Sequence, residues 1–299
     1  VQEMDKKKIG LKNINVMKLH VLETGKFKLD GGAMFGVVPK RMWQKMHPAD
    51  DDNLCTWQMR CLLVEDGNRK ILIDTGVGSK QDDRFRSHFY PHDDIDFTES
   101  LAKIGLTTED ITDVFLTHFH FDHVGGALKR DAQGAIVPVF PNATYWSNEV
   151  HYNWALNPNA REAASFLKEN FVPMRDQGIL QMIDVQEGIK FSDNISLSFV
   201  YGHTEAMMLP YISLPSGNTL IYCADLIPSH HHIQMPYVMA YDLRPLETMK
   251  EKKILHDVAT DGKHFLFFEH DLDVACGFLT KNENGRVVFG GEVNIADII

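Results

Sequence analysis

The chain has 299 residues, of which 44% are hydrophobic and 24% are charged, and this ordinary composition excludes wholesale disorder and fibrous repeats. Acidic residues outnumber basic ones by 41 to 30, and the net charge of −11 disfavours nucleic-acid binding, because phosphate contacts need lysine and arginine. No apolar stretch reaches the roughly 18–20 residues that a membrane span requires, so integral membrane proteins are excluded. Without a low-complexity linker or a short repeat, residues 1–299 are expected to form one domain.

The first quarter of the chain predicts strands and turns. Residues 16–23 alternate loosely between apolar and polar side chains and predict a first strand, and residues 30–36 predict a glycine-rich turn. Residues 59–65 and 70–74 are apolar runs that flank Asp66-Gly67-Asn68. This pattern predicts a β-hairpin, because an Asp-Gly pair supplies the positive φ angles of a tight turn.

Helices and strands alternate in the rest of the chain. Phe97, Leu101 and Ile104 recur at helical spacing and predict a helix that ends at Gly105. A short apolar run at 113–117 is typical of a buried strand. Further strands are expected at 143–146, 195–200, 211–214, 219–223 and 265–268, and amphipathic helices at 160–171 and 245–259. The alternation indicates an α/β fold.

The cysteines and the N-terminus bear on the cellular compartment. Four cysteines are too few and too scattered for a disulfide framework, so we expect reduced thiols, although Cys55 and Cys61 could pair. No apolar segment follows the first basic residues, so no signal peptide is visible and we expect a cytoplasmic protein. Because the chain begins with valine, export of a precursor that was later trimmed stays open.

The strongest chemical signal is the motif His118-x-His120-x-Asp122-His123, which directly follows the strand expected at 113–117. Imidazole nitrogen and carboxylate oxygen are ligands for zinc, iron and manganese. Six residues cannot easily direct four groups at one ion. The motif therefore favours His118 and His120 on one metal, and Asp122 and His123 on its neighbour. The alternative, a histidine-rich surface loop without a metal, fits this specific residue order poorly.

Three more candidate ligands lie at the ends of later strands. His203 follows the strand at 195–200, Asp225 ends the strand at 219–223, and His270 follows the strand at 265–268. Each one alone would be an ordinary turn, cap or core residue. Together with the first motif they present ligands from four strand ends toward one edge, which is what a two-metal site requires.

In order and spacing, these seven residues resemble the ligand set of the metallo-β-lactamase fold hydrolases, and the resemblance runs from about Leu29 to His270. Within that superfamily, residues 30–40, 225–228 and 239–242 resemble the branch that contains N-acyl-homoserine lactonases and methyl parathion hydrolase. The resemblance implies a four-layer αββα sandwich with the site along one edge of its two sheets.

The resemblance also implies the role of each ligand. It places His118, His120 and His203 on the first metal, Asp122, His123 and His270 on the second, and Asp225 between them. Two divalent ions, zinc first among them and Mn²⁺, Fe²⁺ or Co²⁺ as alternatives, would hold a bridging hydroxide at neutral pH. The implied reaction opens a lactone or carboxylic ester, as in quorum quenching. Asp122 would orient the hydroxide and pass a proton to the leaving alkoxide.

Other functions stay open. The same site could act on a phosphotriester or phosphodiester, although the net charge of −11 disfavours polyanionic substrates. A mononuclear iron dioxygenase and a metal-binding protein without turnover are further alternatives; a single-iron site is disfavoured because all seven ligand positions are filled. We expect a small-molecule substrate and no nucleic-acid or membrane partner, with a homodimer left open.

Residues around the motif are harder to interpret. Asp74 ends the strand at 70–74 and could either accept a hydrogen bond from a ligand imidazole or cap the turn that follows. Candidate apolar walls of a pocket are Met34, Phe35, Trp43 and residues 228–238, each of which is also a good core residue. His230, His231 and His232 are not expected to be ligands, but one of them could face the substrate.

Overall fold

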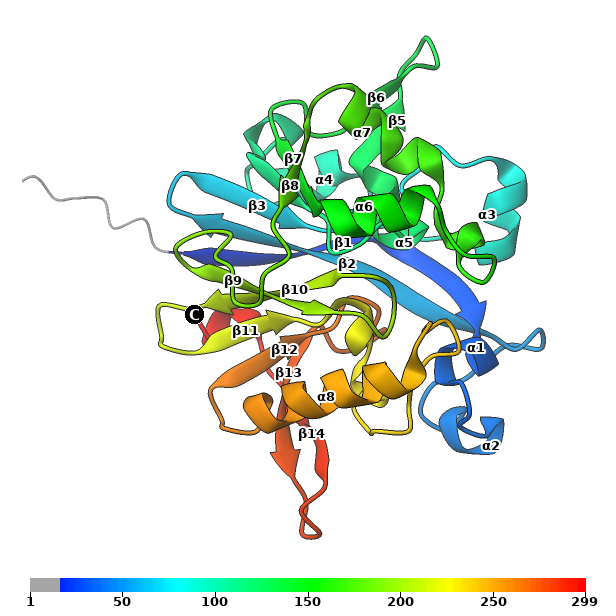
Figure 1. Ribbon diagram of the computed structural model, residues 1–299, viewed down its shortest axis with the longest axis vertical. Helices are drawn as coiled ribbons and strands as arrows, with labels where there is room; N and C mark the ends of the chain where they lie inside the picture. Colours follow the sequence, from blue (N-terminus) through cyan, green and yellow to red (C-terminus); the bar gives the residue numbers. More distant parts are fainter. Residues whose placement is uncertain (1–16) are drawn as a thin grey trace, which may run out of the picture.

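Two six-stranded β-sheets form the centre of the computed structural model, which describes residues 17–299 (Figure 1). The strand order is β1-β2-β3-β4-β7-β8 in the first sheet and β14-β13-β12-β11-β10-β9 in the second. The first sheet contains β1 (Lys18–Asp30), β2 (Leu54–Asp66), β3 (Arg69–Ile73), β4 (Asp113–Phe115), β7 (Thr144–Asn148) and β8 (Leu180–Ile183). The second contains β9 (Ile195–Val200), β10 (Met207–Ser213), β11 (Thr219–Tyr222), β12 (His264–Phe267), β13 (Cys276–Lys281) and β14 (Val287–Glu292). A separate small hairpin joins β5 (Leu128–Arg130) to β6 (Ile136–Pro138).

Helices cover the outer faces of both sheets. The α-helices are α1 (Gly31–Phe35), α2 (Lys40–Trp43), α3 (Asp83–Phe89), α4 (Phe97–Ala102), α5 (Phe121–Val124), α6 (Glu149–Leu156), α7 (Val172–Asp176) and α8 (Pro245–Ala259). The 3₁₀ turns are η1 (Thr108–Asp110), η2 (Gly125–Ala127), η3 (Ala163–Ser165), η4 (Lys168–Asn170), η5 (Ala224–Leu226), η6 (His230–His232) and η7 (Ile295–Asp297). Figure 1 shows α4, α6 and α7 beside the first sheet and α8 across the second. Among residues 17–299, no helix is both long and apolar enough to span a membrane.

The core between the sheets follows from the alternation of side chains along each strand. Leu62 and Ile73 of the first sheet belong to one buried cluster with Ile221 of the second. Their sequence neighbours Leu63 and Leu72 point the other way and pack under the helices. Both faces of the first sheet are therefore buried, and the α/β prediction with an αββα sandwich is confirmed.

A third apolar cluster fixes the position of α1. Strands β1 and β2 have 13 residues each and carry their apolar side chains beyond the shorter strands. Phe35 of α1 stacks on Trp43, with their ring centroids 5.2 Å apart, and packs at 5.9 Å against Trp57 of β2. Phe35 and Trp43 are thus core residues, and they fix the short helix whose other residues border the functional site.

Several predicted elements are confirmed. The strand at 195–200 and the helix at 245–259 begin and end at the predicted residues, and the hairpin with Gly67 in its turn is present. The strand expected at 16–23 runs from Lys18 to Asp30, and its predicted first residue, Val16, lies outside the described residues. All four cysteines are free and buried.

Two predictions were wrong. Residues 160–171 do not form a helix but two 3₁₀ turns, in which Glu162 and Phe166 are buried against His120 while Phe171 stacks on Phe119. The helix of this region lies earlier, at α6, where the side chain of Asn148 caps it by accepting from the backbone N–H of His151. The turn expected at 30–36 contains the five-residue helix α1, capped by the side chain of Asp30.

The inter-sheet core predicts a clear difference between two leucines. Leu62→Ala removes a side chain with no exposed surface and should lower the free energy of unfolding by about 2–5 kcal/mol, because it leaves a cavity. Leu246→Ala on α8, where the side chain is 75% exposed, is the matched control and should change it by no more than about 0.5 kcal/mol. Urea unfolding followed by circular dichroism measures both. Equal losses in the two variants would contradict the described core.

Candidate metal site

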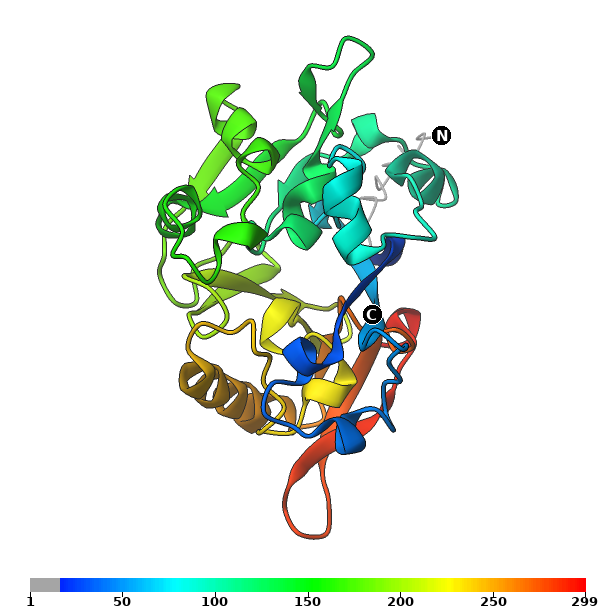
Figure 2. The same cartoon turned by 90° about the vertical axis from the view of Figure 1, so that its right-hand side faces the viewer.

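The seven predicted ligand side chains meet at one edge of the two sheets. His118, His120, Asp122 and His123 come from the loop after β4 and from α5. The others lie after strands of the second sheet: His203 after β9, Asp225 in η5 and His270 after β12. All seven are at least 93% buried. Figure 2 shows the backbone from the side, with the cyan to green segments, which include β4 and α5, above the yellow to red segments, which include η5 and β12.

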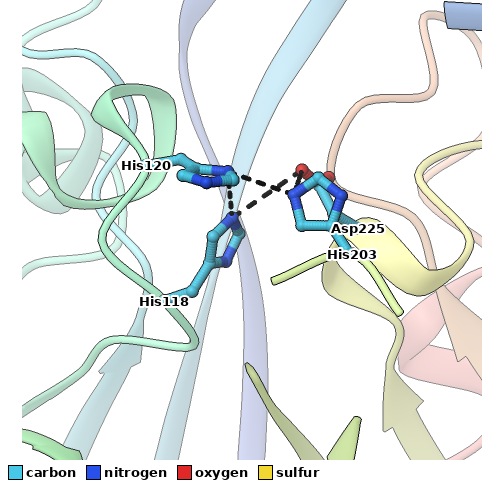
Figure 3. Close-up of side chains that lie close together, drawn as sticks. All are labelled: His118, His120, His203 and Asp225. Carbon is cyan, nitrogen blue, oxygen red and sulfur yellow. Dashed lines mark hydrogen bonds and ion pairs between the residues drawn. The ribbon is translucent and has the colours of Figure 1, made fainter. Parts of the chain in front are cut away.

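The first group consists of His118, His120, His203 and Asp225, whose ligand atoms all lie within 4.8 Å of one another. His120 Nδ1 lies 3.1 Å from His118 Nε2 and 3.1 Å from His203 Nε2. Asp225 Oδ2 lies 3.0 Å from His203 Nε2. Figure 3 shows the four side chains pointing toward one common centre.

The second group consists of Asp122, His123 and His270. The Nε2 atoms of the two imidazoles are 3.2 Å apart, and Asp122 Oδ2 lies 3.7 Å from His270 Nε2. Asp225 connects the groups, because its Oδ1 lies 3.2 Å from His270 Nε2 while its Oδ2 faces the first group. The carboxylate of Asp225 therefore lies between two separate sets of ligands.

These distances fit a metal ion in each group. Ligands about 2.0–2.1 Å from a tetrahedral zinc lie about 3.3 Å from one another, close to the separations of the nitrogen and oxygen atoms in the first group. Asp225 Oδ1 is buried without a hydrogen-bond donor, which is costly unless a cation satisfies it. The donor set of imidazoles and carboxylates suits zinc, manganese, iron and cobalt alike.

Each ligand imidazole is held by a hydrogen bond from its outer nitrogen. The acceptors are Thr117 Oγ1 for His118 (3.0 Å), Glu162 Oε1 for His120 (3.0 Å), Asp242 Oδ1 for His203 (2.8 Å), Asp74 Oδ2 and Glu269 Oε2 for His123 (3.1 Å each) and the backbone oxygen of Gln58 for His270 (2.9 Å). When the outer nitrogen carries the only proton of the ring, the inner nitrogen presents its lone pair to the centre of the site. His120 presents Nδ1 in this way, and the other four present Nε2.

Burial and nearby carboxylates shift the pKa values of the imidazoles in opposite directions. Burial disfavours the charged form and lowers the pKa of His118 and His120. Burial also acts on His203 and His270, but there the nearby carboxylates together outweigh it, with Asp225 first among them and Asp242 or Glu269 adding to it, and raise the pKa to about 10 and about 9. A metal ion that bound these two imidazoles would therefore release protons.

Asp74 makes the contacts of a residue that orients ligands. It is fully buried with a φ of 57°, and its carboxylate accepts from the backbone N–H and the hydroxyl of Thr117 at 2.8 and 2.7 Å. The same hydroxyl accepts from His118, while Asp74 Oδ2 also contacts His123 directly. Asp74 thus reaches one ligand of each group. The structure contains the hydrogen bond between Asp74 and the imidazole of a candidate ligand, and the role of Asp74 toward a metal stays a prediction.

Sequence reasoning missed three other buried carboxylates, those of Glu162, Asp242 and Glu269. Glu269 directly precedes His270, and this adjacency was the available signal. Burial, with the charge of Asp74 adding to it, raises the pKa of Glu269 to about 7. Asp242 stands in a segment that the family resemblance singled out. No local pattern marks Glu162, whose segment was taken for a helix.

A cavity of about 400 Å³ opens onto both groups. Ligand residues form part of its lining, and apolar side chains form much of the rest, namely Leu29, Ala33, Met34, Phe89, Phe121, Ala164, Met239 and Ala240. Arg161, Ser165 and Tyr241 add polar groups. A small organic molecule could therefore contact the ligands and apolar side chains at the same time.

Only some of the residues predicted to form the pocket walls line the cavity. Met34 lines the cavity, whereas residues 228–238 lie outside its lining and the next three residues contribute to it. None of the three adjacent histidines lines it. His232 is buried and bonds the backbone oxygen of Met34 at 2.9 Å, His230 bonds Asp271, and His231 packs against His230.

The fold and the ligand arrangement define a class of protein. The family model of the metallo-beta-lactamase superfamily matches residues 57–270, and the chain belongs to this superfamily. Family membership and the two clusters of metal-ligating side chains together support a hydrolase.

Individual relatives agree with this assignment. An N-acyl homoserine lactonase of Bacillus thuringiensis is 22% identical over 272 residues, which are 87% of this chain and 95% of that protein. A probable metal-dependent hydrolase of Staphylococcus aureus has a similar structure, with a TM-score of 0.83, 24% identity and coverage of 93% of this chain and 96% of the other. The dizinc quorum-quenching lactonase AidC aligns with a TM-score of 0.75 and 23% identity, over 93% of this chain and 95% of its own. The structural likenesses show the shared fold.

The contacts of Asp74 generate a prediction. Asp74→Asn places an amide N–H₂ among donors, so it should disorient His118 and His123 and weaken metal binding about 10–100-fold. Zn²⁺ titration in competition with a chromophoric chelator measures this loss. Asp52→Asn on the exposed surface is the control and should leave metal affinity unchanged. Unchanged affinity in Asp74→Asn would remove the orienting role.

Proposed function

We propose that the protein is a two-metal hydrolase that opens a lactone or carboxylic ester carrying an apolar chain. One observation carries the proposal: two adjacent ligand groups share Asp225 on the wall of a cavity that also has apolar sides. His118, His120 and His203 would hold one ion, Asp122, His123 and His270 the other, and Asp225 both. The lactonase from Bacillus thuringiensis supports the choice of substrate class.

Bound metal would supply two kinds of chemistry, a hydroxide nucleophile at neutral pH and a positive charge that stabilises the developing oxyanion. The remaining work falls to the residues of the chain. Asp122 is a candidate ligand that also lines the cavity, so its carboxylate would orient the hydroxide, accept the proton of that hydroxide after it has added to the carbonyl, and donate the proton to the leaving alkoxide. The buried wall formed by Phe121 and Met34 keeps bulk water from the reacting ester.

The cavity also favours a class of substrate. Phe89 and Phe121 lie 4.4 Å apart between ring centroids, and together with Leu29 and Met34 they form an apolar side on which an acyl chain could pack. Carboxylates of the ligands and of Glu162 face the same space, and the chain carries a charge of −11. A neutral ester fits these surroundings better than a phosphodiester or another anion.

One experiment tests the proposal and its main alternative together. A panel of homoserine lactones, aryl esters and methyl parathion is hydrolysed by one preparation whose metal content is also measured. We expect two zinc-like ions for each chain and preference for a lactone or ester. Preference for the phosphotriester would favour the alternative activity, a single iron would favour the oxygenase, and a metal-replete protein that hydrolyses none of these substrates would contradict the proposal.

The ligand assignment predicts the effect of substitutions. His118→Ala and His203→Ala should each remove one ion and reduce hydrolysis to the background rate, and Asp225→Ala should weaken both ions because it contacts both groups. Chelators should inactivate the enzyme, and Zn²⁺, Mn²⁺ or Co²⁺ should restore activity. Metal analysis and initial rates provide the measurements. His264→Ala, at the start of β12 and outside the cavity lining, is the control, and full activity in any of the first three variants would refute the assignment.

The apolar side of the cavity predicts chain-length dependence. Phe89→Ala should raise KM for esters with long acyl chains about tenfold, equivalent to roughly 1.4 kcal/mol, and change it little for short ones. Phe289→Ala, which packs on His230 away from the cavity lining, should leave the chain-length profile unchanged. An identical profile in Phe89→Ala would show that the chain binds elsewhere.

A further inference from the structure

The loop of residues 157–165 both lines the cavity and contacts the candidate ligand His120. Arg161, Glu162, Ala164 and Ser165 all border the cavity, yet Glu162 is 96% buried and its carboxylate is enclosed by hydrogen-bond donors. A carboxylate is expensive to bury unless donors surround it. The contacts of Glu162 therefore indicate what the loop does.

Four donors surround the carboxylate of Glu162. On one side Oε1 accepts from His120 Nε2 at 3.0 Å and from the hydroxyl of Thr204. On the other, Oε2 accepts from Trp154 Nε1 at 2.7 Å and from Asn159 Nδ2 at 3.1 Å. The donors hold the carboxylate in one orientation, and His120 is held with Nδ1 directed at the first ligand group.

The opposite wall of the cavity repeats this arrangement. Met239, Ala240 and Tyr241 line the cavity, and the next residue, Asp242, is 99% buried and accepts from His203 Nδ1 at 2.8 Å. The guanidinium of Arg161 donates to the backbone oxygen of Ala240, so the two walls are also joined to each other. Two imidazoles of the same ligand group are thus oriented by carboxylates from the two walls of the substrate cavity.

We propose that Glu162 and Asp242 are positioning residues that act through His120 and His203 and couple the cavity walls to the first metal ion. The inference rests on the proposed function, since it requires an ion in that group. It assigns these two carboxylates, which do not contact the centre of the site, to the control of its affinity and geometry.

The chemistry of the amide explains why a conservative change should matter. In Glu162→Gln an N–H₂ group must replace one oxygen, facing either His120 Nε2 or the donors Trp154 and Asn159. In the first case His120 must shift its proton to Nδ1, where the lone pair is needed. In the second case the new N–H₂ group faces the N–H donors of Trp154 and Asn159, and this repulsion should push the loop of residues 157–165 away from them. Either outcome disturbs Nδ1 of His120. The same argument holds for Asp242→Asn, which would disturb Nε2 of His203.

Metal affinity measures this role without reference to turnover. Zn²⁺ titration against a chromophoric chelator should show one ion bound about 10–100-fold more weakly in Glu162→Gln and in Asp242→Asn, with the other ion unchanged. The visible spectrum of the Co²⁺-loaded protein should change for the weakened ion in both variants. Glu149→Gln on α6, which removes an exposed ion pair with Arg175, is the matched control and should match the wild type.

The possible results separate this inference from the proposed function. A wild-type chain that binds no ion overturns the proposed function. A wild type that binds two ions, with unchanged affinity and unchanged Co²⁺ spectrum in both folded variants, overturns the inference alone. Thermal unfolding of the metal-free proteins shows whether each variant is folded. If one variant does not fold, the other decides the outcome, because the two carboxylates act on different imidazoles of the same group.

Discussion

The whole site depends on where each imidazole carries its proton. A neutral histidine has one N–H, and it can bind a metal only through the other nitrogen. In this structure an acceptor faces the outer nitrogen of every ligand histidine, and most of these acceptors are buried carboxylates, such as Asp74, Glu162 and Asp242. Buried charges cost free energy unless they are paired, so these carboxylates and imidazoles stabilise one another. The arrangement of ligands is therefore a property of a larger hydrogen-bonded network.

The fold provides a rigid support for that network. The strand ends of two packed sheets hold the loops, and the inter-sheet core fixes their separation. Side chains that differ in role are neighbours in the sequence: Glu162 contacts a ligand while Arg161 and Ala164 line the cavity, and Asp242 follows three cavity residues. Residues that line the cavity and carboxylates that hold the candidate ligands therefore share the same loops, which limits how freely those loops can vary.

Much of the fold and the position of the candidate site could be predicted from the sequence. Ligands at strand ends are local patterns, and the seven side chains do lie together, although their binding of metal remains a prediction. The orienting contacts were beyond reach because their partners are distant in the chain, as with Glu162 and His120 or Gln58 and His270. The error at residues 160–171 has the same cause: the local pattern suggested a helix, whereas Glu162 and Phe166 of that segment are buried against His120, which is distant in the sequence.

The two sheets are built from consecutive halves of the chain, residues 18–183 and 195–292. His118, His120, Asp122 and His123 belong to the earlier half, and the remaining ligands to the later one. During synthesis the earlier half emerges first and can begin to fold, yet it carries an incomplete set of donors. The seven candidate ligands can meet only after His270 has left the ribosome and the halves have docked, so capture of a metal ion would fall at the end of maturation.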